Sequence, residues 1–201
     1  MLNLPDPHDL PNIFLIGMPG AGKSTVGRAL ARKMDRLFID TDEEIVKRNG
    51  VTIATIFEIE GEAGFRHREL GIIKELTQLR GIVMATGGGA ILQADNRQAL
   101  HANGCVVYLA ASIEVLVERT SRDVGKYTGK HMNKKKGNHK TRPLLEGENT
   151  YQRLSELLAI RSPLYAETAH ITVEANHTNC AEFIDKLAIK IAKHVLRTGN
   201  P

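Results

Sequence analysis

The sequence predicts an α/β fold in which helices cover both faces of a five-stranded parallel sheet. Short apolar runs alternate along the chain with segments of helical periodicity, a pattern typical of parallel strands joined by helices. The runs are apolar enough to be buried on both faces, as the strands of such sheets are. Polar residues and glycines follow the first three runs. Because ligands gather at the carboxyl ends of parallel strands, we expect a functional site at this edge.

The individual elements follow from the positions of these runs. Strands are expected at residues 12–17, 37–40, 82–86, 105–110 and 170–175. Helices are expected at residues 22–34, 42–49, 52–61, 62–80, 95–102, 112–122, 151–161 and about 179–197. Gly61 should separate two consecutive helices, Gly104 should end a helix as its C-cap, and Ser112 should start one as its N-cap.

Length and composition indicate one globular domain over residues 1–201. The chain is 42% hydrophobic and 25% charged, which is typical of a folded protein. Residues 1–10 contain acidic residues and prolines but no basic stretch before a long apolar segment, so we expect a disordered lead-in. No apolar run approaches membrane-spanning length. Cys105 and Cys180 lack ligand-type spacing, and a reducing cytosol fits them. We expect a cytoplasmic monomer without a membrane partner.

The net charge of +4 comes from one segment. Seven cations and no acids lie between Val124 and Leu145, and without them 20 basic residues face 23 acidic ones. The segment contains one aromatic residue, Tyr127, so it lacks the stacking platform of a single-stranded nucleic-acid site. Gly125, Gly129 and Gly137 punctuate it. We expect a basic lid at about 122–142 with a solvated tip, and no nucleic-acid partner.

A phosphate-binding loop follows the first expected strand. Residues 17–24, GMPGAGKS, match the G-x-x-x-x-G-K-[ST] pattern. Glycines let successive backbone N–H groups face a phosphate, and the next helix directs its N-terminal dipole there. Lys23 supplies a cation for the terminal phosphates, and Ser24 offers a hydroxyl to Mg²⁺. The loop therefore predicts nucleotide binding.

The rest of the chain favours a small-molecule kinase over other users of this loop. A GTPase needs an Asp-x-x-Gly after a later strand and an Asn-Lys-x-Asp for guanine, and neither pattern is present. Helicases and motors are usually larger. Asp40 and Asp42 follow the second expected strand, where one carboxylate could hold Mg²⁺ through water and the other could accept a hydrogen bond from an attacking hydroxyl. Both could equally well cap the next helix.

Six segments in order resemble the shikimate kinase family. They are GMPGAGKSTVGRALA, FIDTDEEI, GEAGFRHRE, ATGGGA, RPLL and RSPLY, and the similarity covers roughly residues 13–173. The resemblance implies the nucleoside monophosphate kinase fold, with strand order 2-3-1-4-5, a lid and a substrate-binding region. It also implies transfer of a phosphoryl group from ATP to shikimate, with Mg²⁺ as cofactor, giving shikimate 3-phosphate and ADP in the chorismate and aromatic amino-acid pathway.

The resemblance assigns a nucleotide side to the site. The loop residues that would contact the nucleotide are Gly20, Ala21, Gly22, Lys23, Ser24 and Thr25. Asp40 matches the aspartate that holds Mg²⁺ together with Ser24. Arg119, in ERT, matches an arginine that lies against adenine. Arg142, in RPLL, matches the lid arginine that moves onto the phosphates, and it would be catalytic together with Lys23.

The resemblance also assigns an acceptor side. Asp42 matches the aspartate that binds the substrate hydroxyls and is proposed to orient or deprotonate the attacking one, so it would be catalytic. Arg66 and Arg161 match the arginines that clamp the shikimate carboxylate, for which guanidinium forks are well suited. Gly88 matches a glycine whose backbone contacts the substrate. Glu69 would orient Arg66.

Each of these residues also has an ordinary structural interpretation. Arg66 could be a surface charge on its helix, Arg161 a charge at a helix C-terminus that interacts with the dipole, and residues 87–89 a plain tight turn. Their occurrence together in the family's order favours the functional interpretation. One departure from the family is visible, because Arg119 and Arg142 are 23 positions apart where the family usually has only a short lid.

Three other functions fit the sequence less well. A gluconate-type kinase shares the phosphate loop but has no reason to pair GFR with RSPLY. A nucleic-acid-binding NTPase would use the lysines for salt-dependent phosphate affinity. A nucleotide-binding regulator without catalysis would have lost Lys23 or Asp42, and both are present.

Overall fold

The protein folds around a five-stranded sheet that is parallel throughout, and this confirms the predicted fold class. The computed structural model describes residues 11–128, 149–176 and 181–198. The strand order is β2-β3-β1-β4-β5. The strands are β1 (Asn12–Ile16), β2 (Phe38–Asp40), β3 (Val83–Ala85), β4 (Gly104–Ala110) and β5 (Ile171–Glu174).

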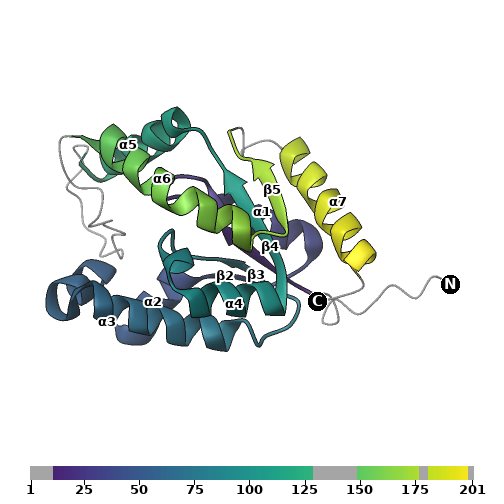
Figure 1. Cartoon of the computed structure of the whole chain (residues 1–201), viewed down its shortest axis with the longest axis horizontal. Coiled ribbons are helices and arrows are strands. Elements are labelled where there is room, and N and C mark those ends of the chain that lie inside the picture. The colour runs from purple at the N-terminus through teal and green to yellow at the C-terminus, as the bar shows by residue number, and fades with distance from the viewer. Residues whose placement is uncertain (1–10, 129–148, 177–180, 199–201) are drawn as a thin grey trace.

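Helices lie on both sides of this sheet (Figure 1). The α-helices are α1 (Lys23–Met34), α2 (Thr41–Asn49), α3 (Ile53–Leu76), α4 (Ala94–Asn103), α5 (Ile113–Thr128), α6 (Thr150–Thr168) and α7 (Ala181–Thr198), and a 3₁₀-helix, η2, spans Ala90–Leu92. Helices α1 and α7 pack together on one face, and α4 and α6 cover the other. None of the described helices is long and apolar enough to cross a membrane.

The central strand β1 is buried along its whole length because it pairs with β3 on one side and β4 on the other. Its apolar side chains form the middle of the hydrophobic core. Its first residue, Asn12, is polar and yet 2% exposed. The Asn12 amide donates to the carbonyls of Thr77, Leu79 and Asn103 and accepts from the Ile82 N–H. One side chain thus joins the turns at the amino edge of the sheet, a contact that the sequence did not predict.

Gly61 confirms one predicted helix boundary. It has φ 67° and ψ −174° inside α3, so the chain makes two helical segments that meet at this glycine.

Gly104 is the C-cap of α4, as predicted, but not in a left-handed conformation. Its φ of 172° is extended backbone, and it is the first residue of β4. A Cβ at this position would lie 2.6 Å from the carbonyl oxygen of Asn12. Glycine is therefore needed here because the neighbouring strand lies so close, and not because of backbone conformation.

Two helices run further than predicted. Helix α6 continues past Pro163 to Thr168, although proline removes one backbone hydrogen bond. Its buried side chains Leu154, Arg161, Tyr165 and Thr168 lie on both sides of the proline, so packing along one helix face outweighs that loss. Helix α5 extends to Thr128, and residues 122–128, expected to begin the lid, continue this helix. The rest of the expected lid that falls in 129–148, and the lead-in 1–10, lie outside the described residues.

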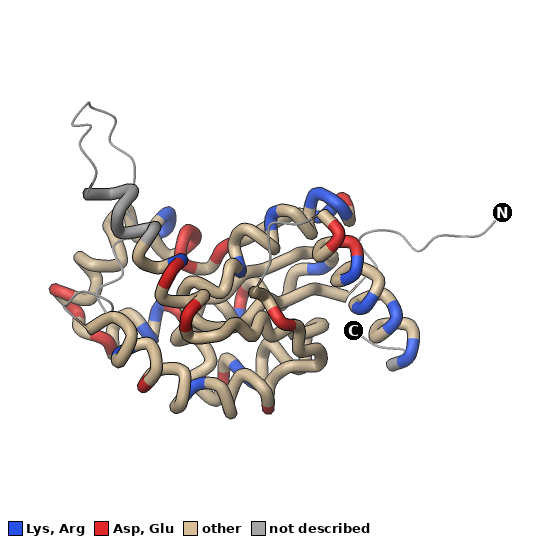
Figure 2. The backbone as a smooth tube through the Cα atoms, turned by 90° about the horizontal axis from the view of Figure 1, so that it is seen from above, with Lys and Arg blue, Asp and Glu red and all other residues tan. Residues whose placement is uncertain are grey.

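Charged residues of both signs are interspersed over most of the described backbone (Figure 2). The exception is α7, where Lys186, Lys190, Lys193 and Arg197 form a basic run. The run gives α7 a local positive charge, whereas the chain without the seven cations of residues 124–145 has 20 basic and 23 acidic residues.

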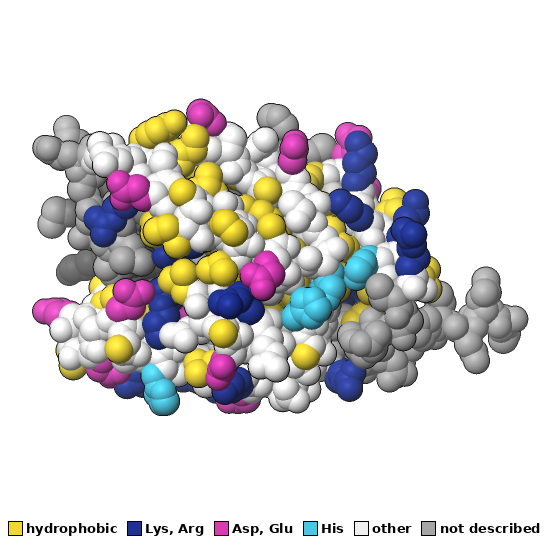
Figure 3. Space-filling model, in the orientation of Figure 1, with side chains coloured by type: hydrophobic (Ala, Val, Ile, Leu, Met, Phe, Trp, Pro, Cys, Tyr) yellow, Lys and Arg dark blue, Asp and Glu magenta, His cyan; other side chains and the backbone are white. Residues whose placement is uncertain are grey.

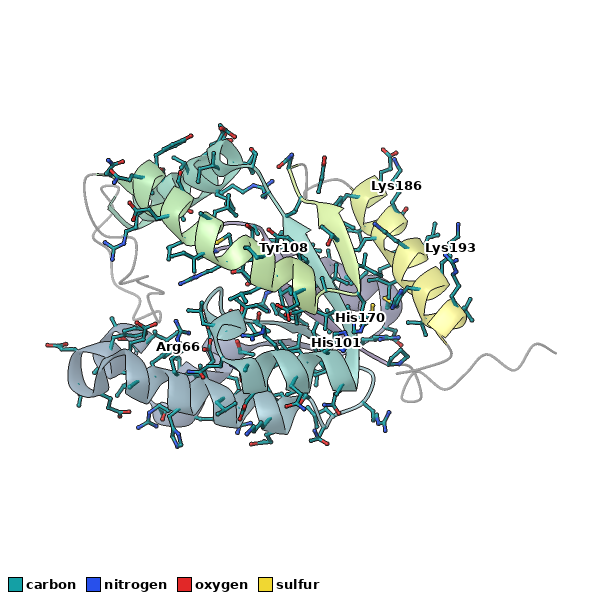
Figure 4. The ribbon with its side chains drawn as sticks, viewed as in Figure 1. Arg66, His101, Tyr108, His170, Lys186 and Lys193 are labelled. Atoms are coloured by element: carbon teal, nitrogen blue, oxygen red, sulfur yellow. The ribbon has the colours of Figure 1, made fainter. Side chains whose placement is uncertain are left out.

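Three histidines gather where α4, α7 and the start of β5 meet (Figures 3 and 4). The ring centroids of His101 and His170 are 4.1 Å apart, and those of His170 and His194 are 5.5 Å apart. The Nδ1 of His170 accepts a hydrogen bond from the Val106 N–H at 3.0 Å. Within the described part of the chain, no group of His, Cys, Asp or Glu side chains is arranged to hold a metal ion. This cluster therefore joins β4 to β5 and lies apart from the site described next.

Candidate active site

The phosphate loop connects β1 to α1 at the carboxyl edge of the sheet. Gly17, Gly20 and Gly22 all have positive φ, which lets the loop turn its backbone N–H groups inward. Gly20 is also confined by α5, because a Cβ there would lie 2.9 Å from the Thr120 hydroxyl. The loop is thus held in shape by both its own helix and a neighbouring one.

Lys23 is folded into the loop that it belongs to. Its ammonium donates to the carbonyl oxygens of Gly17 at 2.8 Å and Met18 at 2.9 Å. The side chain is 9% exposed, so the charge lies inside the curl of the backbone. This arrangement places a cation at the position where the motif binds the terminal phosphates.

The contacts of Asp40 are compatible with both roles that the sequence left open, helix capping and Mg²⁺ binding. Its Oδ1 accepts from the N–H groups of Asp42 at 3.1 Å and Glu43 at 3.3 Å, so it caps α2. Its Oδ2 accepts from the Ser24 hydroxyl at 2.7 Å. A hydroxyl and a carboxylate that meet beside the phosphate loop are oxygen ligands of the kind that Mg²⁺ prefers, so these residues fit the ion.

The triple glycine, residues 87–89, brings the acceptor residues together. The Gly87 N–H donates to the Thr41 hydroxyl at 3.0 Å, which ties the segment to the start of α2. A Cβ at Gly87 would lie 2.8 Å from Asp42 Oδ1 and 2.8 Å from Glu69 Oε1. The segment is therefore more than a plain turn, because its lack of side chains lets two carboxylates approach it.

Arg66 is buried, so the surface-charge interpretation is wrong. It is 7% exposed and lies on α3, on the side nearer to α6 (Figure 4). Its Nη1 donates to Glu69 Oε2 at 2.7 Å, and its Nη2 donates to Glu62 Oε1 at 3.0 Å. The expected pairing of Glu69 with Arg66 is thus present. Burial lowers the pKa of Arg66, but the ion pairs with Glu69 and Glu62 outweigh burial and raise it overall.

Glu69 is completely buried and surrounded by charges. Burial raises its pKa to about 7, the cations of Arg66 and Arg161 oppose that rise, and the carboxylate of Asp42 adds to it. These mutual effects show that the four charged groups form one electrostatic unit around the glycine segment.

Arg161 reaches the same glycine segment from α6. It lies seven residues before the end of the helix, in its interior, so the helix-terminus interpretation is wrong. The side chain is 4% exposed, and its Nη1 donates to the Gly88 carbonyl at 3.2 Å. Among the described residues, no carboxylate lies within ion-pair distance of Arg161, and its Nε has no hydrogen-bond partner.

The two remaining arginines lie elsewhere. Arg119 donates to the carbonyls of Ala175 at 2.9 Å and Asn176 at 2.7 Å, and more weakly to that of Ala21 at 3.5 Å. It therefore joins α5 to the segment after β5, beside the phosphate loop. Arg142 lies outside the described residues.

Two residues of the site were missed from the sequence. Thr41, buried at the start of α2, holds the glycine segment through its hydroxyl. Tyr165 donates to the Gly88 carbonyl at 2.6 Å. The spacing of Tyr165, four residues after Arg161, could have indicated that both side chains lie on one helix face.

The fold and the site define a P-loop kinase: a phosphate loop and an acceptor site meet at the carboxyl edge of a parallel sheet ordered 2-3-1-4-5. The sequence profile of the shikimate kinase family matches residues 19–192, and the chain belongs to this family.

Individual relatives agree with this assignment. A shikimate kinase of Dechloromonas aromatica is 51% identical over 94% of this chain and 90% of its own length. One of Bordetella pertussis is 48% identical over 92% of this chain and 80% of its own length. A solved structure of shikimate kinase from Acinetobacter baumannii in complex with shikimate superposes with a TM-score of 0.78 at 46% identity, covering 95% of this chain and 96% of that one. The shikimate kinase of Aquifex aeolicus gives 0.70 at 29% identity, over 92% of this chain and 98% of that one.

Proposed function

We propose that this protein transfers a phosphoryl group from ATP to a hydroxyl of shikimate, giving shikimate 3-phosphate and ADP. The observation that carries the proposal is the buried guanidinium of Arg161, which has no carboxylate within ion-pair distance in the described structure. A buried charge without a counter-ion is costly, and it is retained where a ligand supplies the opposite charge. The carboxylate of shikimate is such a ligand.

The acceptor site fits a carboxylated polyol. Arg66 is held in place by Glu69 and Glu62, while Arg161 keeps donors that are not used by protein carboxylates. Two guanidinium groups on either side of the glycine segment can bind a planar carboxylate bidentately. Asp42 then orients the attacking hydroxyl, and the Gly88 backbone contacts the ring. Glycine is needed at this position because a Cβ would lie 2.8 Å from Pro19 of the phosphate loop.

The nucleotide side supplies charge neutralisation. The phosphates of ATP lie on the backbone of residues 20–25, with Lys23 on the terminal phosphates and adenine against Arg119. Ser24 and Asp40, whose side chains lie 2.7 Å apart, would hold Mg²⁺. The bound ion would neutralise charge on the phosphates. Arg142, from the lid, completes the set of cations around the transferred group.

A coupled assay of ADP release tests this function directly. Shikimate with ATP should give rapid turnover, and gluconate should give little. The methyl ester of shikimate is a sharper control, because it keeps every hydroxyl but loses the negative charge that Arg66 and Arg161 would bind. We expect its kcat/KM to be at least tenfold lower, from the loss of about 1.5–3 kcal/mol of charge-assisted hydrogen bonding. Equal turnover of acid and ester, or a preference for gluconate, would contradict the proposal.

The nucleic-acid alternative can be excluded in the same assay. An NTPase of that class would release ADP without shikimate and faster when single-stranded DNA or RNA is added. We expect neither polymer to change the rate.

A further inference from the structure

Tyr165 occupies the space between the acceptor site and the phosphate loop. Its side chain is 1% exposed and is the largest fully buried one in the described structure. The hydroxyl donates to the Gly88 carbonyl at 2.6 Å and lies 3.9 Å from the sulfur of Met18, a phosphate-loop residue. The ring stacks on Tyr108 of β4, with centroids 5.0 Å apart and planes inclined by 22°. The position of the hydroxyl is therefore fixed by packing on the ring.

The Gly88 carbonyl can only accept a hydrogen bond, so the Tyr165 hydroxyl must be protonated to donate one. Burial raises the pKa of Tyr165 far above its ordinary value, so the phenol stays protonated and acts as a donor. The bond is much shorter than the 3.2 Å bond from Arg161 to the same oxygen. Tyr165 is thus the principal donor to this carbonyl.

The glycine segment needs such an anchor, because glycine restricts the backbone least of all residues. Its neighbours are already fixed: the Gly87 N–H donates to Thr41, the Gly87 carbonyl accepts from Ala90, and the Gly89 carbonyl accepts from Leu92 at 3.0 Å. The Gly88 carbonyl is the remaining acceptor of the triplet, and the hydroxyl of Tyr165 and the guanidinium of Arg161 are its donors.

We propose that Tyr165 is a positioning residue of the acceptor site: by holding the Gly88 carbonyl, it orients the glycine backbone toward the substrate and leaves the guanidinium of Arg161 available for the substrate carboxylate. The two side chains lie four residues apart on α6, so one helix face presents both groups. Without the hydroxyl, Arg161 alone would have to satisfy the buried carbonyl, and the guanidinium would turn toward the peptide. This inference rests on the proposed function as far as it concerns shikimate.

The test is Tyr165→Phe, which keeps the stacked ring and removes only the hydroxyl. The matched control is Tyr108→Phe, which makes the same change in the partner ring. We expect the KM for shikimate to rise roughly 3- to 10-fold in Tyr165→Phe, from the loss of one neutral hydrogen bond, while the KM for ATP stays within twofold of wild type. Tyr108→Phe should leave both unchanged. A residue with only a packing role would lower Tm without separating the two KM values.

A second measurement, made without substrate, tests whether Tyr165 holds the glycine segment in place. Amide hydrogen exchange in a peptide that covers residues 86–92 should be faster in Tyr165→Phe than in wild type, and unchanged in Tyr108→Phe. Unaltered exchange in this peptide would overturn the anchoring itself, whatever the enzyme phosphorylates. Faster exchange with an unchanged KM for shikimate would overturn the positioning role. Failure of wild-type protein to phosphorylate shikimate would refute the proposed function, and the exchange result would still decide whether Tyr165 holds the segment.

Discussion

Replacing Arg161 by methionine separates the stability of the protein from its affinity for substrate. Methionine is a long, unbranched and adaptable side chain that can fill the space of a buried arginine. The substitution removes a buried cation that has no carboxylate partner in the described structure. The Gly88 carbonyl keeps its hydrogen bond from Tyr165. A buried cation without a directly paired carboxylate is costly, but Arg161 also offsets part of the buried charge of Glu69. We therefore expect the free energy of unfolding of the ligand-free variant to stay within about 1 kcal/mol of wild type.

The effect on substrate binding should be larger. A charge-assisted hydrogen bond contributes about 1.5–3 kcal/mol, so the Kd for shikimate should rise by about 10- to 150-fold. Shikimate at about 100 times the wild-type Kd stabilises the wild-type protein by about 2.7 kcal/mol. At the same concentration the variant should gain only between about 0.3 and about 1.4 kcal/mol. For a domain of this size, each kcal/mol shifts Tm by roughly 2–4 °C.

Thermal unfolding with and without shikimate measures both effects in one assay. Arg153→Met is the matched control, since Arg153 lies on the exposed face of the same helix. The control should keep the full shikimate-induced rise in Tm. If Arg161→Met were strongly destabilised without ligand and still showed the wild-type rise, Arg161 would be a structural residue, and our reasoning about its charge would be wrong.

Three further substitutions test other parts of the site and fold. Lys23→Ala should abolish turnover while circular dichroism stays native, because Lys23 is the cation inside the loop; wild-type turnover would remove the kinase assignment. Asp42→Asn keeps the side-chain shape and loses the charge, so kcat should fall by about 10²–10⁴ with a modest change in KM, and near-normal kcat would limit Asp42 to positioning. Burial and the neighbouring histidines lower the pKa of His170 from 6.5 to about 4. The unfolded chain therefore binds the proton more readily, and stability should be highest above pH 6.5 and decline as the pH falls toward 4. His170→Asn, which offers the Val106 N–H an acceptor that does not titrate, should flatten the decline of Tm over this range, whereas parallel curves would exclude His170 as its source.

The fold was predictable because the pattern of apolar residues along the chain determines where the strands and helices form. All five strands and every predicted helix were found, since each buried strand is a short apolar run bounded by polar residues or glycine. The errors arose where one residue type serves two physical purposes. Gly104 could be needed for a left-handed backbone or for close approach to another strand, and only the position of Asn12 shows that it is the second. The helix expected at residues 151–161 continues past Pro163, because side chains on both sides of the proline are buried.

The site was predictable as far as its residues belong to linear motifs. The phosphate loop is contiguous, so its shape follows from its own sequence. Arg66 and Arg161 are 95 positions apart, and neither their burial nor their common approach to the glycine segment can be derived from local sequence. The resemblance to the family supplied that relation. The contacts of Thr41 and Tyr165 with the glycine backbone depend on how separate elements meet, and they became visible only in the structure.

The two oxygens of Asp40 have a consequence for how this enzyme could change its substrate. One oxygen fixes the first turn of α2, where Asp42 lies, and the other is held by Ser24 on α1. Any shift of α2 to admit a larger or differently shaped acceptor would drag the same carboxylate away from Ser24. The α2 wall of the site is therefore the least free to diverge. New specificities should arise across the glycine segment, on α6, at positions that do not contact the phosphate loop as Tyr165 does.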